Sequence, residues 1–372
     1  MKPAILPMKN NQKPQPKAGV LQIAPYVGGK SSAKGKRVVK LSSNETPLGA
    51  SPKAISAFTD IGVSLHRYPD GTSIKLREAL AEVYSLPVDQ LVCGSGSDEL
   101  IGLLVHAYAG SGDEILYSQH GFLMYKIYAQ GAGATPVTAP EKNLRTDVDA
   151  ILAAVTPRTK IVFIANPNNP TGSYISSSEM KRLHNGLPGD VILAIDDAYS
   201  EYATDIADYT TGQELVETSE NVIMLRTFSK IYGLAALRVG WAYAPASIID
   251  ALNRIRGPFN VSAAAISAAA AAVRDTAFTE NARQFNKKWL AWLSDELKKI
   301  GLKVYPSIAN FVLVEFPKGK HSAANANIFM MENGLIPRDV ASYGLPDCLR
   351  ISIGLEEDNR AVVQTLTDFL KQ

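Results

Sequence analysis

The sequence predicts an α/β protein with a large and a small domain. We expect the large domain to hold a mostly parallel sheet of about seven strands covered by helices on both faces, and the small domain to be α/β as well. Short apolar runs rich in Val and Ile alternate with helical patterns from residue 85 onward. These runs lack polar alternation, as expected for strands with both sheet faces covered. A second, shorter alternation follows residue 300.

The composition excludes several classes of protein. The 372 residues include 38 Lys and Arg against 36 Asp and Glu, a formal charge of +2. This balance argues against nucleic acid or an anionic membrane as the main partner. The chain is 46% hydrophobic and 20% charged, which is typical of globular proteins, and its length predicts two or three structural units.

The cysteines and the first residues bear on the compartment. Cys93 and Cys348 lie far apart and form no CxxC pair, so we expect neither a disulfide framework nor a metal site. Residues 1–19 are rich in Lys and Pro and contain no apolar run of a secretory signal. No stretch approaches the roughly 18 apolar residues of a membrane span. We therefore expect a cytoplasmic protein with residues 1–40 as an N-terminal arm.

The strands of the large sheet are predicted from seven apolar runs bounded by Gly, Pro, Asn or Asp. Two helical patterns between them cover Asp98–Ala109 and Ser176–Asn185. The seven runs are Leu91–Cys93, Glu114–Tyr117, Thr135–Thr138, Ile161–Ala165, Val191–Ile195, Val222–Thr227 and Val239–Tyr243.

The smaller domain is predicted from the last third of the chain. An Ala-rich helix over Ser262–Arg274 is followed by a long amphipathic helix over Thr279–Ile300. Strands are expected near Lys303–Tyr305, Phe311–Glu315 and Cys348–Ser352, with short helices between them.

Ligands of parallel sheets bind beyond the carboxyl ends of the strands, so the polar residues after each run are the candidates. After the first run, the segment Gly94–Glu99 opens a helix. Its glycines permit a tight turn whose amides suit a phosphate, and an N-capped helix is an equal alternative. Glu99 stands where a dinucleotide fingerprint requires a third Gly, which disfavours a nucleotide-binding dehydrogenase.

Two further runs end in polar side chains. The turn Asn166–Gly172 contains two prolines and holds Asn169 between them, which suits a rigidly oriented amide donor. Asp196 and Asp197 follow the next run, where a buried carboxylate is costly unless it is paired or hydrogen-bonded. An N-cap is the alternative role for either Asp.

Lys230 is the candidate nucleophile. It follows the strand that ends at Thr227, and Arg238 lies downstream to hold an anion. A buried Lys beside cationic neighbours has its pKa lowered, and this favours the neutral amine that Schiff-base chemistry needs.

At this point three motifs resemble a known family. Asn169-Pro170-Thr171-Gly172, Asp196-x-x-Tyr199 and Ser229-Lys230-x-x-Gly233-Leu234 with Arg238 look like the large-domain signature of the fold type I pyridoxal-phosphate aminotransferases. The resemblance extends from about Leu41 to Gly354. Within that family the chain is most similar to the histidinol-phosphate aminotransferase group, on these segments: Pro25-Tyr26, Asn44–Gly49, Arg67–Asp70, Gly96–Glu99 and Arg338 with Tyr343–Ile351.

The resemblance implies pyridoxal 5'-phosphate as cofactor. Lys230 would form the Schiff base and move the substrate proton, and Asp196 would keep the pyridinium nitrogen protonated. Asn169 and Tyr199 would donate to the ring's phenolic oxygen. The other cofactor contacts would come from Ser97, Asp98, Phe122, Thr227, Ser229 and Arg238.

The resemblance also implies a homodimer, in which Tyr68 reaches the cofactor phosphate of the neighbouring subunit. The substrate would meet Tyr26, Asn44, Arg338 and Arg350. The two arginines suit a phosphate or an α-carboxylate equally, and the sequence leaves open which anion is bound.

His120 departs from the usual Pro-containing lead-in to Phe122. It is either a substrate contact or a hydrogen-bonded loop histidine, and the second interpretation is favoured.

The implied reaction converts histidinol phosphate and 2-oxoglutarate to imidazole acetol phosphate and glutamate, a step of histidine biosynthesis. Within enzymes, an aromatic amino-acid aminotransferase and a threonine-phosphate decarboxylase are the alternatives. A catalytically silent, aminotransferase-like sensor is the alternative outside enzymes. It is disfavoured because the residues before 40 are too few and too polar for a DNA-binding domain.

The resemblance orders the domains along the chain. Residues 41–65 would form the first part of the small domain and a linker, residues 66–260 the large cofactor-binding domain, and residues 261–372 the C-terminal small domain.

Overall fold

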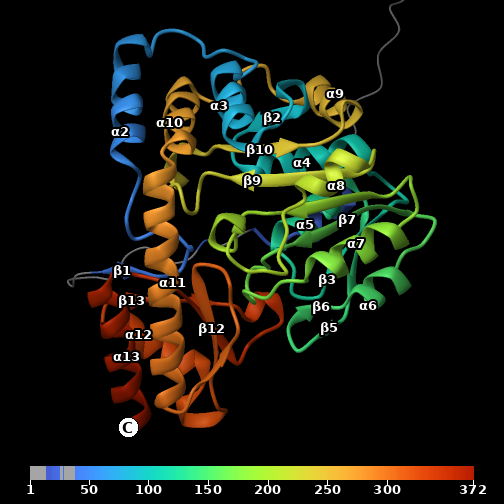
Figure 1. Ribbon diagram of the computed structural model, residues 1–372. Helices are drawn as coiled ribbons and strands as arrows, with labels where there is room; N and C mark the ends of the chain where they lie inside the picture. The colour runs from blue at the N-terminus through green and yellow to red at the C-terminus, as the bar shows by residue number, and fades with distance from the viewer. Residues whose placement is uncertain (1–13, 26–27, 29–37) are drawn as a thin grey trace, which may run out of the picture.

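A seven-stranded mixed sheet forms the centre of the large domain in the computed structural model, which describes residues 14–25, 28 and 38–372 (Figure 1). Its strand order is β2-β10-β9-β8-β7-β3-β4. All seven predicted strands are present within about two residues at each end, a usual uncertainty for element boundaries. The strands are β2 Leu91–Gly94, β3 Glu114–Ser118, β4 Thr135–Ala139, β7 Thr159–Ala165, β8 Ile192–Asp196, β9 Val222–Thr227 and β10 Gly240–Tyr243.

The sheet is mostly parallel, as predicted, with one antiparallel strand. β10 runs antiparallel to both of its neighbours, β2 and β9, while the other described pairings of this sheet are parallel. The connection from β9 to β10 spans residues 228–239 and holds only a short 3-10 turn. A parallel return needs a crossover, usually through a helix, so this connection brings β10 back antiparallel.

Helices cover both faces of the sheet, and each face has its own buried core. On one face, α4 (Ser97–Tyr108), α5 (Leu123–Ala132) and α9 (Ala246–Ile255) pack on residues such as Val92 and Ile115. On the other, α3, α6, α7, α8 and α10 pack on residues such as Leu91 and Leu116. The bounds of these five helices are Ile74–Tyr84, Val148–Ala153, Ser177–Gly186, Gln213–Thr218 and Ala263–Arg274.

The small domain is built on a four-stranded antiparallel sheet of order β11-β12-β15-β14. Three helices cover it, and their apolar residues enclose a separate core that includes Trp289 and Leu349. Its elements are α11 Thr276–Lys299, β11 Lys303–Tyr305, β12 Phe311–Glu315, α12 Ala323–Glu332, β14 Arg338–Asp339, β15 Cys348–Ser352 and α13 Glu356–Lys371.

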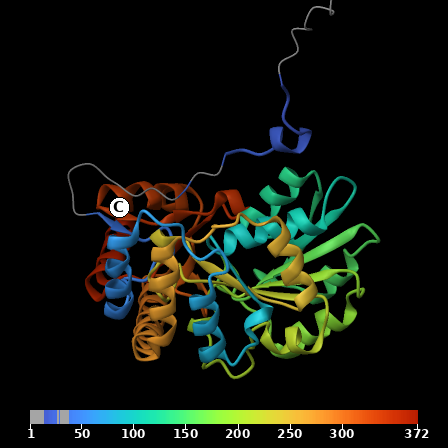
Figure 2. The same ribbon diagram turned by 90° about the horizontal axis from the view of Figure 1, so that it is seen from above.

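An N-terminal strand joins this domain. β1 (Val39–Lys40) pairs in parallel with β13 (Leu335–Ile336), and Leu41 lies in the small-domain core. Figure 2 shows this domain on one side of the molecule and the large sheet on the other. The segment just after residue 40 therefore lies between the two domains.

Helix α10 packs against α2 (Pro52–Thr59) and α3, and the three helices stand together at the top of Figure 1. Ala54 of α2 and the buried alanines of α10 belong to one of the large-sheet cores. This packing favours a large unit that also contains α2 and α10. The boundaries at residues 65 and 260 stay a prediction.

Other described elements lie at the surface of the large domain. The hairpin β5 (Glu141–Lys142) and β6 (Arg145–Thr146) follows β4, and α1 (Ala18–Leu21) lies against α5. None of the described helices combines the length and the apolar character that crossing a bilayer requires. The longest of them, α11, is amphipathic and carries many charges.

Candidate active site

The predicted site residues meet in a cavity of about 280 Å³ at the carboxyl ends of the strands β7, β8 and β9. Every residue predicted to contact the cofactor within one subunit lines it. Lys40, Ser43 and Glu45 line it as well, and these three had no predicted role. The predicted residues that line the cavity are Ser97, Asp98, Phe122, Asn169, Asp196, Tyr199, Thr227, Ser229, Lys230 and Arg238.

One end of the cavity is a cradle suited to an anion. Gly96 has a left-handed φ of 83°, and α4 begins at the next residue. A Cβ on Gly96 would lie 2.5 Å from Nη2 of Arg238, whose Nη1 donates to Oγ of Ser229 over 3.1 Å. A helix N-terminus and a guanidinium therefore border the same space, which is the arrangement that binds a phosphate.

Lys230 lies beside this cradle. Its Nζ donates to the carbonyl oxygen of Ser43 over 3.1 Å and lies 5.6 Å from the centre of the Tyr199 ring. The pKa of Lys230 is lowered to about 8, chiefly by burial and also by the nearby cations of Arg350 and Arg238, while the carboxylates of Glu45 and Asp196 oppose the shift. A substantial fraction of the amine is therefore neutral near physiological pH.

Asp196 and Asp197 have separate surroundings. Asp196 ends β8, and its Oδ2 accepts a hydrogen bond from the Tyr125 hydroxyl over 2.8 Å. Burial raises the pKa of Asp196 to about 6, against the lowering effect of that bond. Asp197 is fully buried and accepts from the Gly212 amide over 2.8 Å. Asp196 is thus the carboxyl group of the cavity, and Asp197 holds the loop before α8.

Asn169 lies on the turn between β7 and α7, whose Asn166-Pro167 and Asn169-Pro170 peptide bonds are both cis. Its Oδ1 accepts a hydrogen bond from Nη1 of Arg350. Nη2 of Arg350 donates to the carbonyl oxygen of Ser42 over 2.6 Å. The bond from the arginine therefore holds the amide of Asn169, a residue that lines the cavity, in one orientation.

Two residues predicted to contact substrate do not line the cavity but bond to residues that do. Asn44 is only 1% exposed and does not line the cavity, and its Nδ2 donates to the Tyr199 hydroxyl over 2.8 Å. Arg350 is 5% exposed, does not line the cavity, and donates to Asn169, which does. Both therefore orient residues of the cavity wall in this structure.

Three other predicted residues lie apart. Arg338 pairs with Arg350 across β14 and β15, so two arginines stand directly opposite each other. Tyr68 is 82% exposed and stacks on Phe259 with the ring centres 4.6 Å apart. Tyr26 lies outside the described residues.

His120 is a bonded loop residue, as favoured from the sequence. It is buried, and its Nδ1 lies 2.6 Å from the carbonyl oxygen of Tyr343 in the small domain. The side chain of Asn168 donates to the His120 carbonyl over 3.3 Å. His120 does not line the cavity, and it connects the loop before Phe122 to the small domain.

Tyr125 and Tyr128 were missed by the sequence analysis. Both lie on α5, where Tyr125 bonds Asp196 and Tyr128 bonds Oδ2 of Asp98 over 2.9 Å. Their spacing of three residues puts them on one side of the helix, and this was the available signal. Because apolar residues lie beside the two tyrosines on α5, the sequence pattern does not distinguish this side of the helix from one that simply packs in a core.

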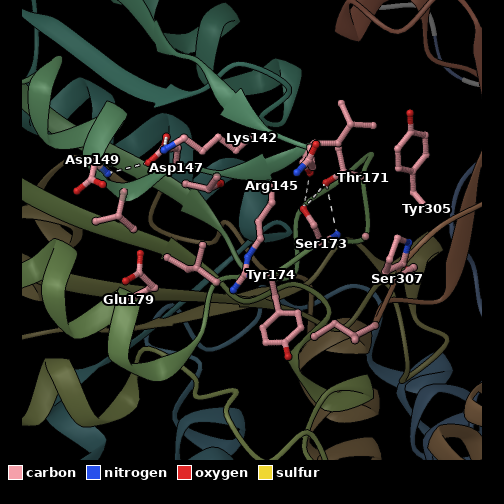
Figure 3. A pocket seen from close by; sticks show the side chains of 18 of the residues that line it. Lys142, Arg145, Asp147, Asp149, Thr171, Ser173, Tyr174, Glu179, Tyr305 and Ser307 are labelled. Atoms are coloured by element: carbon pink, nitrogen blue, oxygen red, sulfur yellow. Dashed lines mark hydrogen bonds and ion pairs between the residues drawn. The ribbon is translucent and has the colours of Figure 1, made fainter.

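A larger hollow of about 730 Å³ lies between the β5–β6 hairpin and residues 305–308 (Figure 3). It contains none of the predicted site residues. Several of its charges are already paired, with Lys142 bonded to Asp147 over 2.7 Å and Arg182 bonded to Asp149 over 2.6 Å. No three His, Cys, Asp or Glu side chains gather as a metal site anywhere in the described part of the chain. The smaller cavity is therefore the candidate active site.

Comparison with known proteins agrees with this geometry. A sequence profile described as aminotransferase class I and II matches residues 36–366. The histidinol-phosphate aminotransferase of Paramagnetospirillum magneticum is 53% identical over 96% of this chain and 99% of its own length. That of Rhodopseudomonas palustris is 53% identical over 97% of this chain and 99% of its own length.

A solved structure extends the comparison to the fold. The histidinol-phosphate aminotransferase of Sinorhizobium meliloti, in complex with pyridoxal-5'-phosphate, superposes with a TM-score of 0.87 at 27% identity, over 95% of this chain and 97% of that one. The profile spans almost all of the chain, and the two curated relatives match it nearly end to end. The chain therefore belongs to the class I and II aminotransferase family.

Proposed function

We propose that this enzyme transfers an amino group from histidinol phosphate to 2-oxoglutarate, forming imidazole acetol phosphate and glutamate, with pyridoxal 5'-phosphate as cofactor. The 53% identity to two proteins named for this activity supports the substrate. The observation that carries the proposal is the pair Arg338 and Arg350, which face each other across β14 and β15. Two guanidinium groups on adjacent strands suit a phosphate, because each can donate paired N–H groups to its oxygens.

The residues present fit the cofactor. The cradle of Gly96, Ser229 and Arg238 has the donors that a phosphate ester requires, and Lys230 lies beside it as an amine that is partly neutral. Lys230 would hold the cofactor covalently, and Phe122 would cover its ring.

When bound, pyridoxal phosphate supplies a carbonyl carbon that takes up the amino group and a ring that accepts the electron pair released at the substrate Cα. The protein's own residues hold and move the protons that this chemistry requires. The carboxylate of Asp196, held by Tyr125, stabilises a proton on a ring nitrogen placed opposite it. The amine of Lys230, once free, would be the base that takes the proton from the substrate Cα and gives it to the cofactor carbon on the other side of the linking nitrogen.

We also propose that the active enzyme is a homodimer with Tyr68 contributed across the interface. Tyr68 is exposed, does not line the cavity of its own chain, and stacks on the half-exposed Phe259. Exposed apolar side chains surround this region of the chain, and such clusters mark protein interfaces. They include Ile55, Phe58, Val63, Leu65 and Ile74.

A cytoplasmic location is part of the proposal. Both cysteines are free and buried, and burial raises the pKa of the Cys93 and Cys348 thiols to about 12. Thiols kept in this form suit a reducing compartment.

A half-reaction panel tests the substrate. Enzyme loaded with cofactor is mixed with L-histidinol phosphate, phenylalanine, tyrosine or L-threonine phosphate, and the loss of the visible absorption band is followed without an acceptor. Rapid conversion by histidinol phosphate supports the proposal. Conversion by phenylalanine or tyrosine alone would favour the aromatic aminotransferase, and release of carbon dioxide from threonine phosphate would favour the decarboxylase.

A further inference from the structure

Lys40 and Glu45 form an ion pair at the active-site cavity. Nζ of Lys40 lies 2.8 Å from Oε1 of Glu45, and both side chains line the cavity. They are 32% and 40% exposed, so the pair faces space that a ligand can enter.

The chain segment between them runs along the cavity wall. Its Ser42 carbonyl accepts a hydrogen bond from Arg350, and its Ser43 carbonyl accepts one from Lys230. The pair joins the two ends of this segment, since Lys40 comes before Ser42 and Glu45 follows Asn44. The charged pair therefore closes the segment whose carbonyl groups contact both the reacting amine and Arg350.

The proposed reaction gives this cavity two different ligands in turn. Histidinol phosphate carries an imidazole ring, which donates an N–H hydrogen bond and is cationic when protonated. Glutamate and 2-oxoglutarate carry a distal carboxylate instead. The arginines suit the anionic end of either ligand, but a single fixed charge at the other end would attract one ligand and repel the other.

We propose that the Lys40–Glu45 pair recognises both substrates by exchanging partners. Glu45 accepts the imidazole N–H of histidinol phosphate, and Lys40 donates to the distal carboxylate of glutamate and 2-oxoglutarate. An ion pair this exposed contributes little to stability, so opening it for either ligand costs little. This inference rests on the proposed function and extends it to substrate selection.

Calorimetry and half-reactions on the loaded enzyme test the inference. Lys40→Met should weaken binding of glutarate, a dicarboxylate that cannot react, about tenfold and leave the half-saturation by histidinol phosphate within about twofold. Glu45→Gln should weaken the binding of histidinol phosphate about tenfold and leave the binding of glutarate unchanged or tighter.

The surface pair Lys181 and Glu214 provides matched controls. Their charged atoms are 2.9 Å apart, and neither residue lines the cavity. Lys181→Met and Glu214→Gln should leave the binding of both glutarate and histidinol phosphate unchanged. If Lys40→Met and Glu45→Gln weaken both ligands equally, or neither, the pair only anchors its segment and the inference is wrong.

The wild-type enzyme separates this result from a failure of the proposed function. A wild type that does not react with histidinol phosphate would overturn the proposed function, and with it the role of Glu45. If the wild type does use histidinol phosphate, and each variant loses affinity for both ligands equally, only the inference is overturned.

Discussion

Burial and a few charged neighbours determine the pKa values of the titratable side chains in this cavity. Lys230 and Asp196 show opposite shifts from one cause, since burial lowers the pKa of the Lys230 amine and raises the pKa of the Asp196 carboxyl. The shifts bring both groups closer to neutral pH, where each can exchange protons readily. Tyr125 and Asn44 act behind them as positioning residues for Asp196 and Tyr199.

Removing the amine of Lys230 should stop catalysis. Lys230→Ala is expected to lower turnover by more than about 10³-fold, because the proton at Cα loses its base. The visible absorption band of the loaded enzyme should also disappear, while circular dichroism stays that of the wild type. Lys181→Ala is the control for loss of a lysine. Full turnover in Lys230→Ala would rule out the assigned role.

The lowered pKa of Lys230 predicts a pH dependence of cofactor loading. Only the neutral amine attacks the cofactor's aldehyde, so the loading rate of apoenzyme should rise with pH and level off above about pH 8. Arg350→Gln removes a cation that disfavours the ammonium form, which raises the pKa of Lys230. The midpoint should therefore move to higher pH.

The loading experiment follows the visible band after pyridoxal phosphate is added to apoenzyme across a pH series. Arg158→Gln, which removes a surface arginine paired with Glu114, is the control and should keep the wild-type midpoint. A midpoint unchanged in Arg350→Gln would show that this guanidinium does not act on Lys230.

At the scale of elements, the anion cradle depends on how closely β10 approaches α4. A Cβ on Gly240 would lie 2.3 Å from the Ser97 amide nitrogen and 2.8 Å from the Arg226 carbonyl oxygen. Both are backbone atoms in the centre of the domain, so neither can swing aside. Strand, helix N-terminus and Arg238 thus form one rigid unit around the space for a phosphate.

Gly240→Ala should disturb this unit. Overpacking of this kind costs about 1–3 kcal/mol of unfolding free energy, and the displaced Ser97 amide should weaken cofactor binding about tenfold or more. Denaturant unfolding and a cofactor titration measure the two effects. Gly189→Ala is the matched control, because its added Cβ meets nothing within 4 Å. Equal behaviour of the two variants would contradict the packing argument.

The whole molecule places the active site between its two domains. Asn44 bridges them through Tyr199 of the large domain and Ser352 of the small domain, and His120 bridges them through Tyr343. Substrate binding near Arg350 would therefore act on the contact between the domains. The second subunit is proposed to complete the site from the exposed side that carries Tyr68.

Mixing two inactive variants tests that arrangement. In a hybrid dimer of Lys230→Ala and Tyr68→Ala chains, one site combines an intact Lys230 with an intact partner Tyr68. An equal mixture, dissociated and reassembled, should recover about a quarter of wild-type activity, since half of the dimers are hybrids with one complete site. Recovery no greater than that of Tyr68→Ala alone would show that Tyr68 acts within its own chain.

The sequence by itself determined the sheet, its strands and the residues that follow them. Asn169, Asp196 and Lys230 each come after a run of apolar residues, and parallel strands bring their carboxyl ends to one edge, so local pattern was sufficient. The tertiary structure alone decided which side chains orient them. Tyr125 lies 71 residues from Asp196, Asn44 lies 155 from Tyr199 and Arg350 lies 181 from Asn169. Such contacts depend on how α5 and the small domain dock onto the sheet, and no local periodicity encodes that docking.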